Sequence, residues 1–187
     1  MLRDRGDPIH QHQGAGEWTE AEMAVIRVQT ADFDLGVETR ALTAGRTDIG
    51  AIGSFLGTVR DTAGGRKITS MTLEHYPGMT ERAMARIAAE AEGRWPLQGC
   101  TLIHRVGTLM PGENIVLVLA ASPHRQAALD ATGFLIDWLK TKAPFWKLEE
   151  AAGESRWVEA RDSDDQAAAK WGIAAQGADG TSKQEGK

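Results

Sequence analysis

A lysine-rich segment, residues 140–147 (KTKAPFWK), carries side chains that could do covalent or acid–base chemistry. Ammonium groups that crowd together lower one another's pKa, and a lysine tuned toward neutrality can act as a nucleophile or as a general acid or base. The segment also has an ordinary interpretation. Cations suit the C-terminal end of a helix, which Pro144 would terminate, and Phe145 and Trp146 would belong to the core. Both interpretations stay open at this point.

Two other segments place basic side chains where an anion could bind. Residues 57–60 (GTVR) end a predicted strand before a glycine-rich loop, so Arg60 could hold an anion through two parallel hydrogen bonds. Residues 122–125 (SPHR) would open a helix with the serine as N-cap and the proline as first helical residue. His124 and Arg125 would then stand beside free backbone N–H groups, where positive side chains are unfavourable unless an anion neutralises them. The alternative for both segments is an exposed basic side chain that binds nothing.

The spacing of these segments limits how they could cooperate. Arg125 and Lys140 are fifteen residues apart, which is about 22 Å along the axis of one continuous helix. One small ligand cannot touch both residues of the same chain. Either they serve different sites, or a two-fold dimer brings His124 and Arg125 of one chain to Lys140 of the other, and we favour the dimer.

Strands and helices alternate around these segments. Apolar periodicity predicts strands at residues 24–29, 49–59, 68–76, 101–106, 115–121, 145–150 and 156–159. It predicts helices at residues 33–44, 80–94 with Thr80 as N-cap, 123–143, and 163–171 with Ser163 as N-cap. Glycines at positions 50, 53 and 57 indicate a bulge or a close backbone approach in their strand, and residues 61–67 read as a loop. The pattern predicts an α+β domain with mainly antiparallel sheet and two principal helices.

Composition indicates one globular domain. The chain has 187 residues, 42% of them hydrophobic and 25% charged, with a formal net charge of −5. A single cysteine, Cys100, excludes a disulfide framework, a cysteine-rich zinc site and an iron–sulfur cluster, and a buried, inert thiol is expected. His10 and His12 have metal-like spacing but no third ligand nearby, so no metal site is expected. No apolar run approaches the ~20 residues of a membrane span, and no secretory signal is evident, which predicts a cytoplasmic protein.

The chain is predicted to divide into a domain, residues 23–172, and two disordered tails, residues 1–22 and 173–187. Residues 50–150 carry eleven basic and ten acidic residues, whereas both flanking regions are acidic. An anionic ligand is therefore expected to meet the middle of the domain. The acidic balance of the whole chain argues against generic nucleic-acid binding.

Six segments together carry a family resemblance. They are residues 55–60 (FLGTVR), 73–79 (LEHYPGM), 103–107 (IHRVG), 124–125 (HR), 139–147 (LKTKAPFWK) and 156–161 (RWVEAR). In this order and spacing, over residues 23–171, the chain resembles the catalytic, large subunit family of molybdopterin synthase. No segment identifies the family by itself. The most diagnostic one is residues 139–147, which combines lysines with aromatic residues.

The resemblance implies a fold and a reaction. The family has an α/β-hammerhead-like fold and forms a central homodimer, with a small ubiquitin-like sulfur-carrier subunit at each end of a 2+2 heterotetramer. The carrier's C-terminal Gly-Gly tail bears a thiocarboxylate and inserts into the large subunit's pocket. Two sulfurs pass in turn to cyclic pyranopterin monophosphate and form the dithiolene of molybdopterin. This step of molybdenum cofactor biosynthesis implies no metal or redox cofactor.

The resemblance also assigns roles to residues. Lys140 would be the essential catalytic lysine, and Lys147 a second one near the thiocarboxylate. The phosphate and pterin end of the substrate would be held by Arg60, His124 and Arg125, with Thr58 and Val59 beside Arg60 on the same strand end. Further positions would line the pocket, namely Phe55, Ile136 and Glu149.

Two other functions compete with sulfur transfer. One is a small enzyme that binds phosphate or cleaves acyl phosphates with Arg60 and works without a protein partner. Its weakness is that no asparagine or other water-positioning group stands near Arg60. The other is a non-catalytic adaptor that binds a ubiquitin-like tail.

Overall fold

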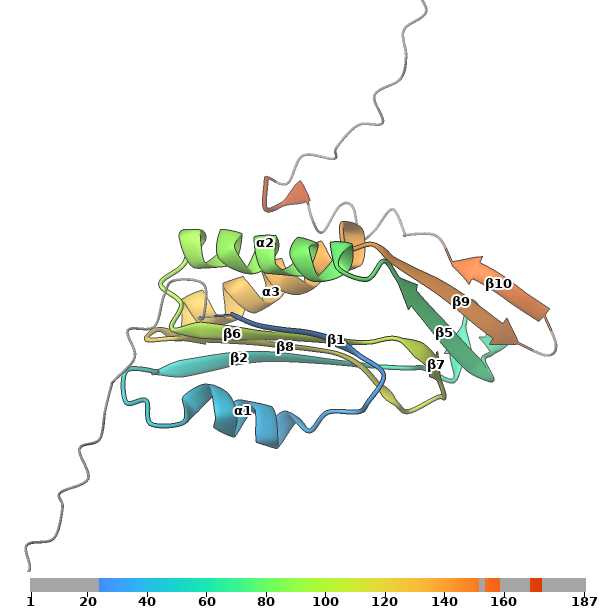
Figure 1. Ribbon diagram of the computed structural model, residues 1–187, viewed down its shortest axis with the longest axis horizontal. Helices are drawn as coiled ribbons and strands as arrows, with labels where there is room; N and C mark the ends of the chain where they lie inside the picture. Colours follow the sequence, from blue (N-terminus) through green and yellow to red (C-terminus); the bar gives the residue numbers. More distant parts are fainter. Residues whose placement is uncertain (1–23, 152–153, 159–168, 173–187) are drawn as a thin grey trace, which may run out of the picture.

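Two four-stranded sheets form the framework of the protein, of which this computed structural model describes residues 24–151, 154–158 and 169–172 (Figure 1). The larger sheet has the order β1-β6-β8-β2. Its strands are β1 (Ala24–Gln29), β2 (Ala51–Thr58), β6 (Gly99–Arg105) and β8 (Asn114–Ser122). β1 pairs in parallel with β6, and the other two pairings are antiparallel. The central strands β6 and β8 are buried on both faces, which explains their continuous apolar sequences.

Helices cover both faces of this sheet (Figure 1). The helices α2 (Met79–Arg94) and α3 (Arg125–Thr141) pack on one face, and α1 (Leu35–Thr43) packs on the other. The main core lies beneath α2 and α3, where both helices bury apolar side chains, including Met84, Ile87, Leu135 and Leu139. A smaller core cluster beneath α1 contains Phe33, Ile103, Leu117 and Leu119.

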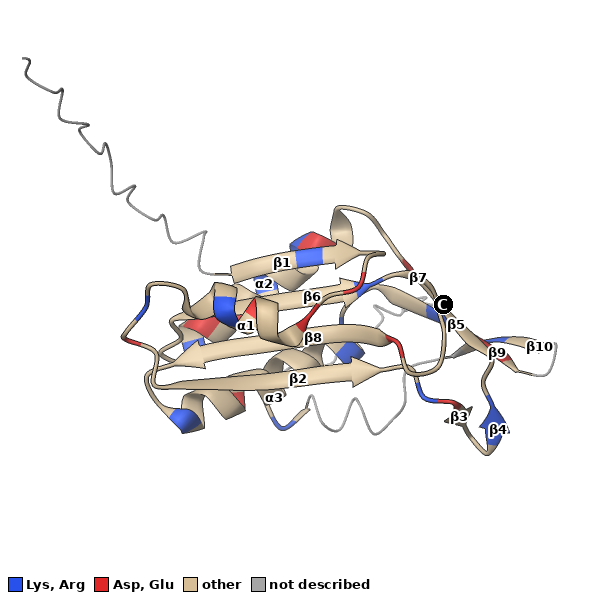
Figure 2. Ribbon diagram, turned by 90° about the horizontal axis from the view of Figure 1, so that it is seen from below, with Lys and Arg blue, Asp and Glu red and all other residues tan. Residues whose placement is uncertain are grey.

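The smaller sheet extends beyond one end of the larger one (Figure 2). It has the order β10-β9-β5-β7, all antiparallel, with β5 (Ser70–His75), β7 (Gly107–Leu109), β9 (Phe145–Ala151) and β10 (Glu154–Val158). Beside it, the predicted loop at residues 61–67 is a hairpin of β3 (Thr62–Ala63) and β4 (Arg66–Lys67). Gly64 and Gly65 form its two-residue turn at φ 57° and 77°, a conformation that glycine adopts without strain.

The start of α2 differs from the prediction. Its N-cap is Gly78, and Thr80 lies inside the first turn. The Gly78 N–H donates to Glu81 Oε2 at 2.6 Å, which is the N3 half of a capping box, while Gly78 has no side chain to cap the first turn. The Thr80 hydroxyl instead accepts from the backbone N–H of Tyr76 at 3.2 Å and ties the preceding turn to the helix.

The start of α3, in contrast, was predicted two residues too early. Ser122 is the last residue of β8, where it pairs with Ala51, and its hydroxyl donates to the Pro96 carbonyl at 3.0 Å. His124 is therefore the N-cap, and Arg125 is the first helical residue. The Ser122 carbonyl accepts from the Gly50 N–H at 3.0 Å, so it cannot accept the first hydrogen bond of the helix. The Ser122 hydroxyl still accepts from the His124 N–H at 3.2 Å, which is the part of the predicted cap that remains.

The predicted α+β class with mainly antiparallel sheet and two principal helices is confirmed, and the shorter helix predicted at residues 33–44 is present as α1. The predicted tails, the closing helix capped by Ser163, and His10 and His12 lie outside the described residues. Within the described ranges, no helix has the length and apolar character needed to cross a membrane.

Candidate active site

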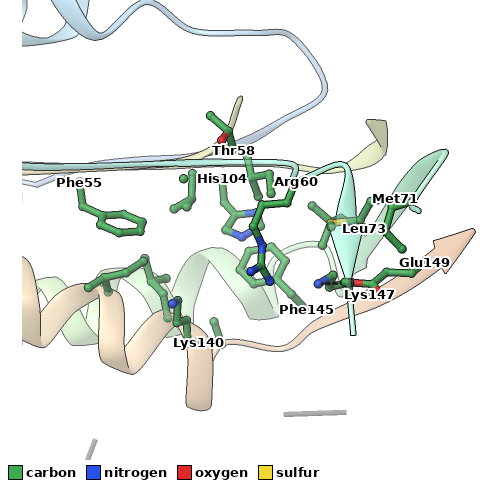
Figure 3. Close-up of a pocket in the computed structure, with 18 of the residues that line it drawn as sticks. Phe55, Thr58, Arg60, Met71, Leu73, His104, Lys140, Phe145, Lys147 and Glu149 are labelled. Atoms are coloured by element: carbon green, nitrogen blue, oxygen red, sulfur yellow. Dashed lines mark ion pairs between the residues drawn. The ribbon is translucent and has the colours of Figure 1, made fainter. Parts of the chain in front are cut away.

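A cavity of about 640 Å³ lies where the two sheets meet, next to the C-terminal part of α3 (Figure 3). This volume is typical of a small-molecule site, for which the range is about 300–1,000 Å³. Among its charged lining residues, three are basic and one is acidic, so the cavity favours an anion. Of the ten predicted site residues, seven line it: Phe55, Thr58, Arg60, Ile136, Lys140, Lys147 and Glu149.

Close packing of α3 on β2 brings two walls of the cavity together. A Cβ on Gly53 of β2 would lie 2.3 Å from Thr132 Oγ1 and 2.4 Å from the Ala128 carbonyl oxygen of α3. Only glycine permits this approach. Between Gly57 and Thr58 the register of β2 shifts, and the resulting bulge redirects the end of the strand, where Thr58 lines the cavity. Both features that the glycines of this strand indicated are thus present.

Two basic side chains enter the cavity from opposite walls. Arg60 follows β2, Lys140 lies in the last turn of α3, and both side chains are directed into the space between these elements (Figure 3). The Lys140 Nζ atom lies 6.0 Å from the centroid of the Phe55 ring, at the outer limit of a cation–π contact. Within the described residues, neither side chain forms an ion pair, so both positive charges are available to a ligand.

An ion pair on β9 holds the third basic side chain at the cavity wall. Alternate residues of a strand share one face, which places Lys147 and Glu149 together. Their charged atoms, Nζ and Oε1, are 2.6 Å apart. The glutamate side chain is 8% exposed and the lysine side chain 30%. The carboxylate therefore orients the ammonium group, which in turn compensates an otherwise buried negative charge.

The cavity is also lined by His104, for which the sequence predicts no role. His104 lies on β6, and its ring stacks on Phe145 with centroids 3.7 Å apart and planes at 16°. Burial lowers the pKa of His104 to about 4, so the imidazole is neutral at pH 7. The only sequence feature that pointed to His104 was its position in residues 103–107, one of the six segments that carry the family resemblance. A histidine inside a continuously buried strand looks like a core residue until the neighbouring sheet is placed against it.

Three predicted site residues lie away from the cavity. Val59 is 2% exposed, packs against Met71, Leu73 and Leu109, and does not line the cavity. His124 and Arg125 stand at the opposite end of α3 from Lys140, and neither lines the cavity. Because α3 is continuous from Arg125 to Thr141, the separation argued from the sequence applies.

Three side chains settle alternatives that the sequence left open. Trp146 does not belong to the core: it is 44% exposed and contacts Tyr76, with ring centroids 5.8 Å apart. Lys142 is the C-cap of α3 and lies outside the cavity, so the three lysines do not act as one cluster. Cys100 is fully buried, and burial raises its pKa to about 12, as expected for an inert thiol.

Comparisons with known proteins agree with this arrangement. The family model described as MoaE protein matches residues 28–142. The molybdopterin synthase catalytic subunit of Pseudomonas aeruginosa is 57% identical over 146 residues, which cover 78% of this chain and 97% of that protein. The corresponding subunit of Mesorhizobium japonicum is 56% identical over 148 residues, covering 78% and 92%.

The chain belongs to the MoaE protein family. A solved MoaE protein from Burkholderia ambifaria, described as a molybdopterin biosynthesis protein, superimposes with a TM-score of 0.70 at 50% identity, covering 81% of this chain and all of that one. Membership of the MoaE family confirms the resemblance that the six segments predicted, and with it the α/β-hammerhead-like fold class. The roles of individual cavity residues follow from their positions and are taken up as proposals below.

Proposed function

We propose that this MoaE family protein is the catalytic subunit of a molybdopterin synthase. It would transfer two sulfur atoms from the thiocarboxylated C-terminus of a small ubiquitin-like carrier to cyclic pyranopterin monophosphate and so form the molybdopterin dithiolene. The observation that carries this proposal is the 640 Å³ cavity into which Arg60, Lys140 and Lys147 project. Both reactants are anions, and relatives with most of this chain in common are named as catalytic subunits of this synthase.

Each basic residue would have its own task. Arg60 is suited to a phosphate, since its guanidinium can donate two parallel hydrogen bonds. Lys140, with no carboxylate partner in the described residues, would neutralise charge that develops on the reacting atoms and transfer a proton there. Lys147, oriented by Glu149, would meet the thiocarboxylate. This chemistry asks for anion neutralisation and proton transfer, and the proposal includes no metal or redox cofactor.

A two-fold dimer would complete the site. His124 and Arg125 lie about 22 Å from Lys140 along α3, so they can contact the same small substrate only through a second copy of the chain. One copy would supply Lys140 and Lys147, and its partner would supply His124 and Arg125 to the phosphate or pterin end. With one carrier subunit at each end, the assembly would be a 2+2 heterotetramer. The cytoplasmic location predicted from the sequence remains part of this proposal.

The test is molybdopterin formation from cyclic pyranopterin monophosphate and a thiocarboxylated carrier protein. We expect product with the wild-type chain and a loss of at least about 10²-fold in rate with Lys140→Ala, since the charge lies where the reaction would occur. Lys142→Ala is the matched control, because it removes a lysine of the same segment that lies outside the cavity. Its rate should stay within about twofold of wild type.

Binding measurements separate the alternatives. Lys140→Ala should still bind the carrier, since one side chain inside the cavity is changed. If folded, carrier-bound wild-type protein makes no product, the enzyme proposal fails and the adaptor function is favoured. If turnover of a phosphate substrate needs no carrier, the partner-independent phosphate enzyme is favoured instead.

A further inference from the structure

The backbone around His104 determines which of its ring nitrogens carries the proton. Nδ1 lies 2.8 Å from the carbonyl oxygen of Arg105. A carbonyl oxygen can only accept, so Nδ1 must be the protonated donor. In the neutral ring, Nε2 is then an unprotonated acceptor with a free lone pair. Because burial holds the pKa of His104 near 4, this form persists at neutral pH.

The unprotonated Nε2 of His104 is accessible from the cavity. His104 is 8% exposed and lines the cavity, while one face of its ring is covered by Phe145. Within the described part of the chain, Nε2 has no hydrogen-bond partner. It is also not one of the fully buried polar atoms that lack a partner, so it keeps some accessible surface. The atom is therefore reachable from the cavity, and Figure 3 shows the His104 ring beside that of Phe145.

Nε2 of His104 is a hydrogen-bond acceptor that is free and fixed in place, and the other polar side chains of this site do not offer one. Arg60, Lys140 and Lys147 can only donate hydrogen bonds. The carboxylate of Glu149 is already paired with Lys147. Threonine hydroxyls rotate and serve as donor or acceptor, so they select weakly. The stacked, hydrogen-bonded imidazole cannot turn to present a donor without losing its bond to the Arg105 carbonyl.

We propose that His104 is a specificity-determining residue that recognises the heterocycle of the substrate, its Nε2 accepting a hydrogen bond from an N–H or O–H group of the pterin ring system. This inference rests on the proposed function, which makes a pterin the ligand. The basic side chains would hold the anionic ends, and His104 would select the ring by its donor. A ring lacking a donor there would leave the buried lone pair unsatisfied, which costs binding free energy.

Substitutions that keep one nitrogen's role at a time test this proposal. In His104→Asn, the side-chain amide can still donate to the Arg105 carbonyl but presents no acceptor to the cavity. In His104→Gln, the longer side chain can place its carbonyl oxygen near the position of Nε2. We expect His104→Asn to raise KM for the pterin by roughly 10- to 100-fold with kcat within about threefold, and His104→Gln to restore most of the loss.

Two controls separate recognition from folding. His75 stacks on the same phenyl ring, with centroids 6.5 Å apart, but does not line the cavity, so His75→Asn should leave KM for the pterin unchanged. KM for the carrier should also be unchanged in His104→Asn. Wild-type KM for the pterin in His104→Asn would overturn the inference, as would equal loss of kcat in the asparagine and glutamine variants. Absence of product with the wild type would instead refute the proposed function.

A measurement on the wild-type chain decides the question even if the variants do not fold. Nitrogen-15 NMR of the His104 ring should show a protonated Nδ1 and an unprotonated Nε2, and adding cyclic pyranopterin monophosphate should shift the Nε2 resonance toward hydrogen-bonded values. A protonated Nε2 in the free protein, or a resonance that does not move when pterin fluorescence shows the site to be saturated, would overturn the inference.

Discussion

Replacing Gly53 with alanine tests whether the contact between β2 and α3 sets the geometry of the cavity. The new Cβ would lie 2.3 Å from Thr132 Oγ1 and 2.4 Å from the Ala128 carbonyl oxygen, whereas ordinary contacts begin at 3.4 Å. The threonine hydroxyl can rotate, but the carbonyl belongs to the helix backbone. The strand and helix must therefore separate by roughly 1 Å, and Lys140 on α3 would move away from Arg60 after β2.

The expected magnitude combines two opposing effects. Overpacking costs about 1–3 kcal/mol and occasionally more, and alanine in a strand recovers about 0.5–1 kcal/mol of backbone entropy relative to glycine. Because a backbone atom blocks the new methyl group, we expect a net loss of about 2 kcal/mol in the free energy of unfolding, or roughly 4–8 °C in Tm. A displacement of about 1 Å between the two cationic walls should lower the rate of molybdopterin formation by about 10²-fold.

Urea unfolding and thermal melts measure the stability change, and the sulfur-transfer assay measures the rate. Gly93→Ala is the matched control: Gly93 lies within α2 with open space around its Cα, so alanine there should stabilise the protein by up to about 1 kcal/mol. Adding Thr132→Ala to Gly53→Ala should recover only part of the loss, because the Ala128 carbonyl still blocks the methyl group. A Gly53→Ala protein with wild-type Tm and rate would refute the reasoning.

Two further predictions concern buried ionisable groups. Glu149→Gln should lower the free energy of unfolding by about 1–3 kcal/mol and reduce turnover, because the partly buried Lys147 ammonium loses its carboxylate. The control is Glu90→Gln, at the exposed pair with Arg94, which should change stability by less than about 0.5 kcal/mol in the same denaturation assay. Folding keeps His104 neutral down to pH about 4, whereas the unfolded chain binds a proton below about 6.5, so stability should fall by about 3 kcal/mol as pH drops from 6.5 to 4. Urea midpoints across this pH range should show that loss in the wild type and a smaller one in His104→Asn. An equal dependence of stability on pH in the two proteins would contradict the lowered pKa of His104.

Several parts of the site could be predicted because their signals are local. The close approach at Gly53 and the bulge after Gly57 both follow from glycines inside a strand, and the structure shows each of them. The end of α3 before Pro144 follows from the geometry of proline. The lysine segment placed Lys140 and Lys147 as candidates, and both line the cavity.

Other parts depended on pairing partners far away in the sequence. Ser122 reads as an N-cap, but its pairing with Ala51 across the sheet holds it in a strand. Val59 directly precedes Arg60, yet its side chain is buried in the smaller sheet's core while Arg60 lines the cavity. The outcome at such positions is decided by which surface the neighbouring strand presents, and local periodicity does not report that.

The family follows from the resemblance of six segments of the sequence. Residue type, periodicity and the positions of glycine and proline act over a few neighbours, so the sequence by itself also determined the α+β class and made Arg60 and the lysines of residues 140–147 candidates. Only the tertiary structure decided that His104 shares the cavity with Lys140, and that Trp146 faces outward while Phe145 faces the ligand space. The physical reason is that a cavity forms between elements: β6, α3 and β9 are distant along the chain, and their burial together against two sheets selects which side chains meet.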